Sequence, residues 1–186
     1  MACGADGVEL DVWARSDDVL VVTHNWTDGP LLTLDEVLAI DAPEGFWFDI
    51  EAKSAPGLAP QAEHYADLLS DTLQGVGRRI MVRSFDHAIL RAFHAIEPEA
   101  QLAALIDYDS DAWVFIALAA GGGIISPHYS TVTVDRVSDA HDAGIGVSVW
   151  TVNDPADWER MAVLGVDTMI TDDPCSAVRH FKKGTG

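Results

Sequence analysis

The chain has 186 residues, nearly half of them apolar, which is enough for one globular domain with a sizeable core and excludes a disordered chain. Its 30 acidic residues outnumber its 11 basic ones, so the surface repels nucleic acid and anionic membranes, and neither is expected as a partner. No apolar run approaches the roughly 18 residues that span a bilayer, so no transmembrane segment is expected.

Segments typical of strands and helices alternate along the chain. Two short extended runs over 7–13 and 19–23 come first, and a capping box of Thr33 and Glu36 predicts a helix over 34–40. The strands expected after it are 46–51, 79–84, 101–106, 123–126, 145–151 and 166–171. The helices expected between and after these strands are 60–75, 87–96, 111–120, 132–143, 155–164 and 175–182.

This alternation predicts an α/β fold with a parallel sheet, and both an open doubly wound sheet and a closed barrel fit it. Seven strands are followed by helices if 19–23 is treated as part of a long loop. A TIM-type (β/α)8 barrel needs eight such units. Because the chain opens directly on a strand, we expect one barrel domain over 1–186, with the first βα unit missing and seven of the eight strands present.

Three carboxylates stand near the ends of two expected strands. Glu9 and Asp11 are two residues apart, so their side chains point to the same face, and Glu51 ends the next strand. Parallel barrels place their active-site residues at strand ends, and carboxylates there are costly to bury unless they bind a cation. The pattern predicts a Mg²⁺ or Ca²⁺ site formed by Glu9, Asp11 and Glu51, although a solvated strand face would show the same spacing.

Other side chains could complete a catalytic site. His24 closes an extended run, and an imidazole there suits acid–base chemistry. Lys53 lies two residues beyond Glu51 and could contact a phosphate oxygen, or it could be an ordinary surface lysine. Trp150 ends a later strand and could form a wall of the barrel mouth or pack in the core. His128 is the other histidine that follows the end of an expected strand.

The two cysteines, Cys3 and Cys175, lie near opposite ends of the chain and lack the spacing of a metal site. This arrangement predicts two unpaired thiols in a reducing compartment. Met1 is followed by neither a charged n-region nor an apolar h-region, so no secretory signal is visible. We therefore expect a cytoplasmic location, although an incomplete N-terminus would also lack such a signal.

Several short motifs occur along the chain in a recognisable order. They are Gly-Ala-Asp-Gly-Val-Glu-Leu-Asp-Val at 4–12, Leu-Val-Val-Thr-His-Asn at 20–25, Leu-Thr-Leu-Asp-Glu-Val-Leu at 32–38, Asp-Ile-Glu-Ala-Lys at 49–53, Ser-Phe-Asp at 84–86, Trp-Thr-Val-Asn at 150–153, Gly-Val-Asp at 165–167 and Ile-Thr-Asp-Asp-Pro at 170–174. In this order, and over essentially the whole chain, they resemble the motifs of the glycerophosphodiester phosphodiesterase family.

The resemblance implies a TIM-type barrel that binds Ca²⁺ or Mg²⁺ and hydrolyses glycerophosphodiesters to sn-glycerol 3-phosphate and a free alcohol. The expected partner is therefore a small glycerophosphodiester. In the mechanism drawn for the family, the glycerol hydroxyl of the substrate attacks phosphorus while two histidines transfer protons. The implied site residues are the metal ligands Glu9, Asp11 and Glu51, the catalytic His24, the phosphate contact Lys53 and the substrate-site wall Trp150.

The chain departs from the family's pattern at its start. The family opens with a strand ending in His-Arg-Gly and a helix starting Glu-Asn-Thr, and no segment here corresponds to them. Asn25 stands where the family usually has Asp, and the stretch 24–34 is short. We therefore expect an N-terminally truncated chain that forms an open, C-shaped barrel with exposed strand edges and has no measurable turnover by itself.

Two other functions stay open. The chain could be a non-catalytic barrel that keeps the metal site as a binding module. It could also be a related metal-dependent phospholipase or sphingomyelinase D, which shares the Glu-x-Asp pair and the paired histidines. The motifs at 150–153 and 170–174 favour the glycerophosphodiesterase over this last possibility.

Overall fold

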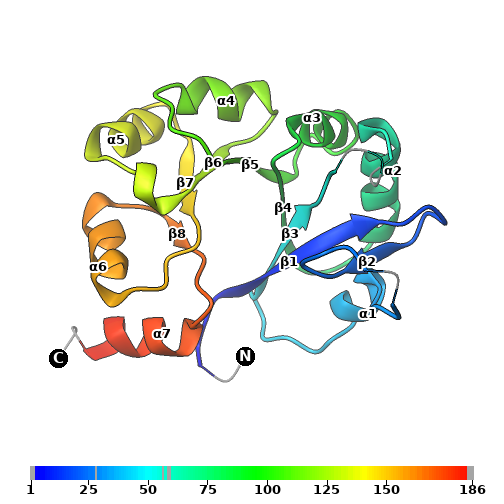
Figure 1. Cartoon of the computed structure of the whole chain (residues 1–186), viewed down its shortest axis with the longest axis horizontal. Helices are drawn as coiled ribbons and strands as arrows, with labels where there is room; N and C mark the ends of the chain where they lie inside the picture. The colour runs from blue at the N-terminus through cyan, green and yellow to red at the C-terminus, as the bar shows by residue number, and fades with distance from the viewer. Residues whose placement is uncertain (1–2, 28, 56, 58–59, 184–186) are drawn as a thin grey trace.

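The fold is a curled sheet whose outer face is covered by helices (Figure 1). The computed structural model describes residues 3–27, 29–55, 57 and 60–183. Its strands are β1 (Gly7–Ala14), β2 (Leu20–Val22), β3 (Trp47–Ala52), β4 (Arg79–Ser84), β5 (Gln101–Ile106), β6 (Ile124–Pro127), β7 (Gly146–Val149) and β8 (Thr168–Met169). Its α-helices are α1 (Leu34–Leu38), α2 (Ala62–Leu73), α3 (His87–Ile96), α4 (Trp113–Ala119), α5 (Val134–Asp142), α6 (Pro155–Leu164) and α7 (Pro174–Lys183).

The sheet is an open TIM-type barrel. Its strand order is β2-β1-β3-β4-β5-β6-β7-β8, and each neighbouring pair is parallel except β1 and β2. The prediction of an α/β barrel with seven parallel strands is therefore confirmed. The run 19–23, expected to belong to a loop, instead supplies β2, which extends the sheet as an antiparallel edge strand.

The barrel is open between β1 and β8 (Figure 1). Among the described residues, β8 pairs with β7 and no ladder joins it to β1. The expected C-shape is thus present. The expectation of a bare edge along all of β1 is wrong for its C-terminal part, where Val12, Trp13 and Ala14 pair with β2. The hairpin of β1 and β2 thus covers that part of the edge. The strands of a parallel barrel are too apolar for such an edge to be exposed to water.

Side-chain caps explain where several helices begin. The predicted capping box is present: the Thr33 hydroxyl accepts from the backbone N–H of Glu36, and the Glu36 carboxylate accepts from the backbone N–H of Thr33. Asp86 and Asp154 cap α3 and α6 through their carboxylates. Gly165 ends α6 with a φ of 81°, a left-handed conformation that glycine adopts without strain.

The apolar core lies between the sheet and its helices. Val82, Ile125 and Val147 of the strands are fully buried there with Leu90 of α3 and Trp113 of α4. Alternate strand residues point the other way, into the barrel, where the site described below is formed. None of the described helices is long and apolar enough to cross a bilayer.

A disulfide bond joins Cys3 to Cys175, with the two Cα atoms 4.9 Å apart. The prediction of two unpaired thiols is therefore wrong. The sequence places these residues 172 positions apart, but the fold brings the segment before β1 alongside α7 at the open side of the barrel (Figure 1). A structural disulfide is typical of an oxidising environment, so the thiols no longer support the expectation of a reducing compartment.

Candidate metal centre

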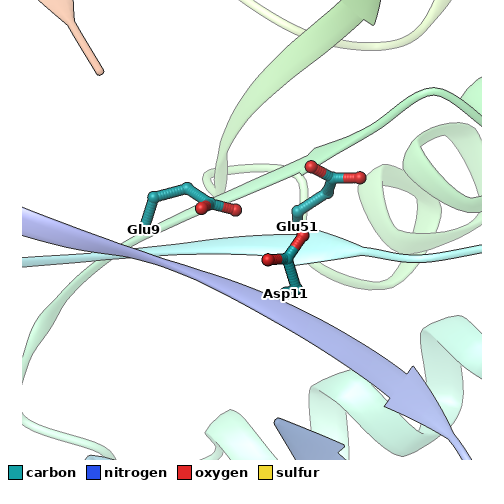
Figure 2. A group of neighbouring side chains, drawn as sticks. All are labelled: Glu9, Asp11 and Glu51. Atoms are coloured by element: carbon teal, nitrogen blue, oxygen red, sulfur yellow. The ribbon is translucent and has the colours of Figure 1, made fainter. Parts of the chain in front are cut away.

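Three carboxylates converge where β1 and β3 run side by side (Figure 2). The parallel register pairs Glu9 with Asp49 and Asp11 with Glu51, and paired residues point to the same face of the sheet. One oxygen from each of Glu9, Asp11 and Glu51 lies within 4.8 Å of the other two. The fold thus brings together the three residues that the sequence singled out as metal ligands.

The donor set of this carboxylate cluster suits a hard cation. Glu9, Asp11 and Glu51 are all half-buried. Oε1 of Glu9 is buried without any hydrogen-bond partner, which is costly for a carboxylate oxygen. Ca²⁺ and Mg²⁺ prefer oxygen ligands of this kind and would provide the missing partner. The residues present therefore fit the divalent metal that the sequence motifs imply.

The electrostatics of the cluster lead to the same conclusion. Burial, followed by the charges of Asp11 and Glu51, raises the pKa of Glu9 to about 8. Burial also raises the pKa of Glu51, while Lys53 opposes the rise. Three carboxylates held this close repel one another, so a bound cation would stabilise all three in their ionised form.

Lys53 forms ion pairs with two of the carboxylates. Its Nζ lies 2.9 Å from Oδ1 of Asp11 and 2.8 Å from Oε1 of Glu51. Partial burial alone would lower the pKa of Lys53, but the hydrogen bonds that its ammonium donates to Glu51 and Asp11 outweigh this effect and the pKa is raised. Lys53 is therefore a charged ammonium group within the site, and not an isolated surface lysine.

His24 lies at the solvent side of the same cluster. Its Nδ1 is 3.0 Å from Oδ2 of Asp11, and its side chain is 77% exposed. An ionised carboxylate can only accept, so this contact assigns the proton to Nδ1 and leaves Nε2 open towards solvent. An imidazole oriented by a carboxylate in this way is suited to proton transfer.

Trp150 directly follows β7, across the barrel from β3 (Figure 1). Its Nε1 donates to the backbone oxygen of Ser126 at 2.9 Å, which fixes the indole ring. Phe85 and His128 pack against the indole in edge-to-face contacts, with centroids 5.4 and 5.2 Å away. These rings follow the C-terminal ends of β4, β6 and β7, so Trp150 belongs to the mouth of the barrel.

Two charged residues beneath the cluster were missed by the sequence analysis. Arg83 of β4 and Asp49 of β3 form a buried ion pair inside the barrel. Asp49 shares the strand face of Glu51, so its inward direction could have been read from the alternation of the strand. The partner of Asp49 could not, because Arg83 comes from the next strand and no sequence signal links the two.

The chain is similar in sequence to known phosphodiesterases. It is 28% identical to the glycerophosphodiester phosphodiesterase of Caldanaerobacter subterraneus subsp. tengcongensis, over 99% of this chain and 89% of that protein. It is 27% identical to the glycerophosphodiester phosphodiesterase of Bacillus altitudinis, over 95% of this chain and 86% of that protein. The first of these alignments extends over essentially all of the chain and so includes β1.

Solved structures share the fold. A putative glycerophosphoryl diester phosphodiesterase from Silicibacter pomeroyi superposes with a TM-score of 0.87 at 23% identity, covering 99% of this chain and 85% of that one. A phosphodiesterase from Oleispira antarctica, determined with its product sn-glycerol-3-phosphate, superposes with a TM-score of 0.86 at 21% identity, covering 97% and 87%.

A protein-family comparison decides which family this is. The match covers residues 25–176, which is most of the chain and includes Glu51, Lys53 and Trp150. Glu9 and Asp11 lie upstream of the matched residues, on the strand that pairs with β3. The chain belongs to the glycerophosphoryl diester phosphodiesterase family.

Proposed function

We propose that this protein hydrolyses glycerophosphodiesters to sn-glycerol 3-phosphate and an alcohol, at a divalent cation bound by Glu9, Asp11 and Glu51. The observation that carries the proposal is the convergence of these carboxylates within 4.8 Å where β1 and β3 pair, with one buried Glu9 oxygen lacking a partner. Membership of the family gives the reaction class. The Oleispira antarctica enzyme, with sn-glycerol-3-phosphate as its named product, supports the product assignment.

A bound cation and Lys53 would supply the positive charge that an anionic phosphodiester requires at this cluster. The chain has a net charge of −19, so an anionic substrate needs local positive charge. When bound, Ca²⁺ or Mg²⁺ supplies that charge and stabilises the phosphoryl oxygens. The Lys53 ammonium, already at the cluster, contacts a phosphate oxygen as a second positive group.

Proton transfer is assigned to His24. Attack of the substrate's glycerol hydroxyl on phosphorus releases one proton, and departure of the alcohol oxygen takes one up. Water then opens the resulting cyclic phosphate. The Nε2 of His24 is available to exchange one of these protons, since Asp11 holds the ring through Nδ1. Trp150, fixed by the hydrogen bond that its Nε1 donates to the backbone oxygen of Ser126, forms the wall of the mouth at the end of β7.

The two proton transfers require two acid–base groups. Among the described residues, His24 is the imidazole that contacts the cluster. We therefore propose that the chain alone turns over slowly or not at all. A βα unit whose strand ends in His-Arg-Gly, added before β1 at the open side of the barrel, would supply the second imidazole. The single histidine at the cluster also favours the second candidate function, a non-catalytic barrel that binds a divalent cation.

Hydrolysis of glycerophosphocholine in the presence of Ca²⁺ tests the proposal. The substrate is offered to the chain as it stands and to a chain extended by the βα unit, and glycerol 3-phosphate is measured with a coupled dehydrogenase. We expect turnover from the extended chain, its loss in EDTA, recovery with Ca²⁺ or Mg²⁺, and no turnover from a matched Glu51→Gln variant. Full activity in excess chelator contradicts the metal site, and Ca²⁺ binding without turnover favours the binding module.

A further inference from the structure

The barrel interior contains a buried ion pair where a TIM-type barrel normally stacks branched apolar side chains. Arg83 is 1% exposed. Its Nε donates to Oδ1 of Asp49 at 2.6 Å, and its Nη2 donates to the other carboxylate oxygen. Burying a guanidinium and a carboxylate is costly even when they are paired, so general stability is a poor explanation for their presence.

The same guanidinium reaches across the interior to the opposite wall. Nη1 of Arg83 donates to the Ser126 hydroxyl on β6 at 3.0 Å, and Nη2 donates to the Ser148 hydroxyl on β7 at 3.2 Å. The Ser126 hydroxyl in turn donates to the backbone oxygen of Ser148 at 2.8 Å. On β5, the residue in register with Arg83 is Ala103, whose short side chain does not block this reach. Arg83 therefore links β3, β4, β6 and β7 from inside the barrel.

Such a link is more important in an open barrel than in a closed one. A closed barrel has its radius set by a continuous ring of paired strands. Here, within the described part of the chain, the ladder ends at β2 beside β1 on one side and at β8 on the other. The distance between the two walls then depends on contacts through the interior. The planar guanidinium fork fixes both the separation and the angle of its partners.

Arg83 is also next to the carboxylate cluster. It is in register with Glu51, and Asp49, which it holds, is in register with Glu9. Because β1 and β3 are paired in register, movement of β3 relative to β6 and β7 would change the curl of the sheet at these two strands. It would thereby change how closely the inward-facing Glu9, Asp11 and Glu51 approach one another and the far wall of the mouth. We propose that Arg83 is a positioning residue, which ties β3 to β6 and β7 and thereby sets the ligand spacing for a divalent cation. This inference rests on the metal site of the proposed function.

Charge and tether can be separated because they predict opposite changes. Arg83 carries a positive charge near the site, so a purely electrostatic role predicts that Arg83→Met binds Ca²⁺ more tightly. The tether predicts weaker binding. The double variant Ser126→Ala/Ser148→Ala is sharper, because it removes the far anchors and keeps every charge. We expect about 10-fold weaker Ca²⁺ binding or more for both variants, as for other residues that support metal ligands.

The experiment is a calorimetric Ca²⁺ titration of the whole chain, with circular dichroism to show that each variant is folded at the titration temperature. Arg136→Met is the matched control, since Arg136 pairs with Asp109 and Asp111 outside the barrel and should bind Ca²⁺ as the wild type does. If Arg83→Met is unfolded, the serine double variant decides. Wild-type affinity in that double variant, or tighter binding in Arg83→Met, overturns the tether. Absence of Ca²⁺ binding by the wild type overturns the metal site itself.

Discussion

Replacing Cys175 with serine removes the bond to Cys3, and we expect the free energy of unfolding to fall by about 5 kcal/mol. The bond joins residues 172 positions apart, and this figure follows from the chain entropy that closing so long a loop removes from the unfolded state. Domains are usually stable by about 5 to 15 kcal/mol, so the variant should lie near its unfolding threshold. At about 2 to 4 °C per kcal/mol, its melting temperature should drop by about 10 to 20 °C.

The loss should appear first beside the opening of the barrel. Cys3 precedes β1, and Cys175 lies in the first turn of α7, which follows β8. Since no described ladder joins β1 to β8, the disulfide is the covalent link between the two sides. Amide hydrogen exchange should therefore accelerate in α7 and in the part of β1 before Val12, for which β3 is the strand neighbour among the described residues, before it does in β4 and β5, which have strand neighbours on both sides.

Thermal denaturation followed by circular dichroism, with and without dithiothreitol, measures the effect. Dithiothreitol should lower the melting temperature of the wild type to that of Cys175→Ser, and it should leave the variant unchanged. A thiol count on the denatured, unreduced wild type should find no free cysteine. Two free thiols per chain would show that the disulfide does not form, and equal melting temperatures for oxidised wild type and variant would show that it does not stabilise the fold.

Four further predictions concern the carboxylate cluster. Glu9, whose pKa is raised to about 8 chiefly by burial, should hold a proton at pH 7 in the absence of metal. Ca²⁺ binding should therefore release up to one proton, and the affinity for Ca²⁺ should increase as the pH approaches 8. Calorimetric titrations in two buffers measure the proton release, and an affinity that does not change with pH would contradict the prediction. In the unfolded chain Glu9 loses its proton near pH 4.5. As the pH rises from about 4.5 to 8, the free energy of unfolding of the metal-free wild type should therefore fall relative to that of Glu9→Gln, and urea denaturation measures both. In the chain extended by the βα unit, His24→Ala should lower kcat by a factor of about 10² to 10⁴ with little change in Ca²⁺ affinity. A normal kcat at saturating Ca²⁺ together with weaker Ca²⁺ binding would instead show that His24 is a metal ligand. Lys53→Met should tighten Ca²⁺ binding, because a positive charge beside the cluster is lost, and should raise the KM for the substrate. Unchanged Ca²⁺ affinity and unchanged KM would show that Lys53 has no role in binding the cation or the substrate.

Much of this arrangement could be predicted because it depends on local rules. The alternation of strand and helix signals indicated the parallel sheet, and residue parity placed Glu9, Asp11 and Glu51 on inward faces. The expected position at a strand end is correct for Glu51, whereas Glu9 and Asp11 lie within β1, which continues to Ala14. The Thr33 and Glu36 capping box defined the start of α1. Each of these inferences uses residues that are close in the sequence, or a rule that applies to every parallel barrel.

The remaining features depend on contacts between distant segments. The three residues of β2 could belong to a loop or a strand, and pairing with Val12 to Ala14 of β1 decides it. The disulfide forms because the open barrel brings its two sides together, which the spacing of the cysteines does not reveal. The reach of Arg83 to Ser126 and Ser148 depends on the curvature of the sheet, which no local pattern specifies.

We propose above that Glu9, Asp11 and Glu51 bind a divalent cation at the mouth of the barrel. The most direct test is a crystal structure of the chain grown with Mn²⁺, which carboxylate sites accept in place of Mg²⁺ or Ca²⁺, with anomalous data to locate the ion. We expect a single strong peak coordinated by an oxygen from each of the three carboxylates. A peak elsewhere, or none at the cluster with the Glu51 side chain turned away from β1, would contradict it.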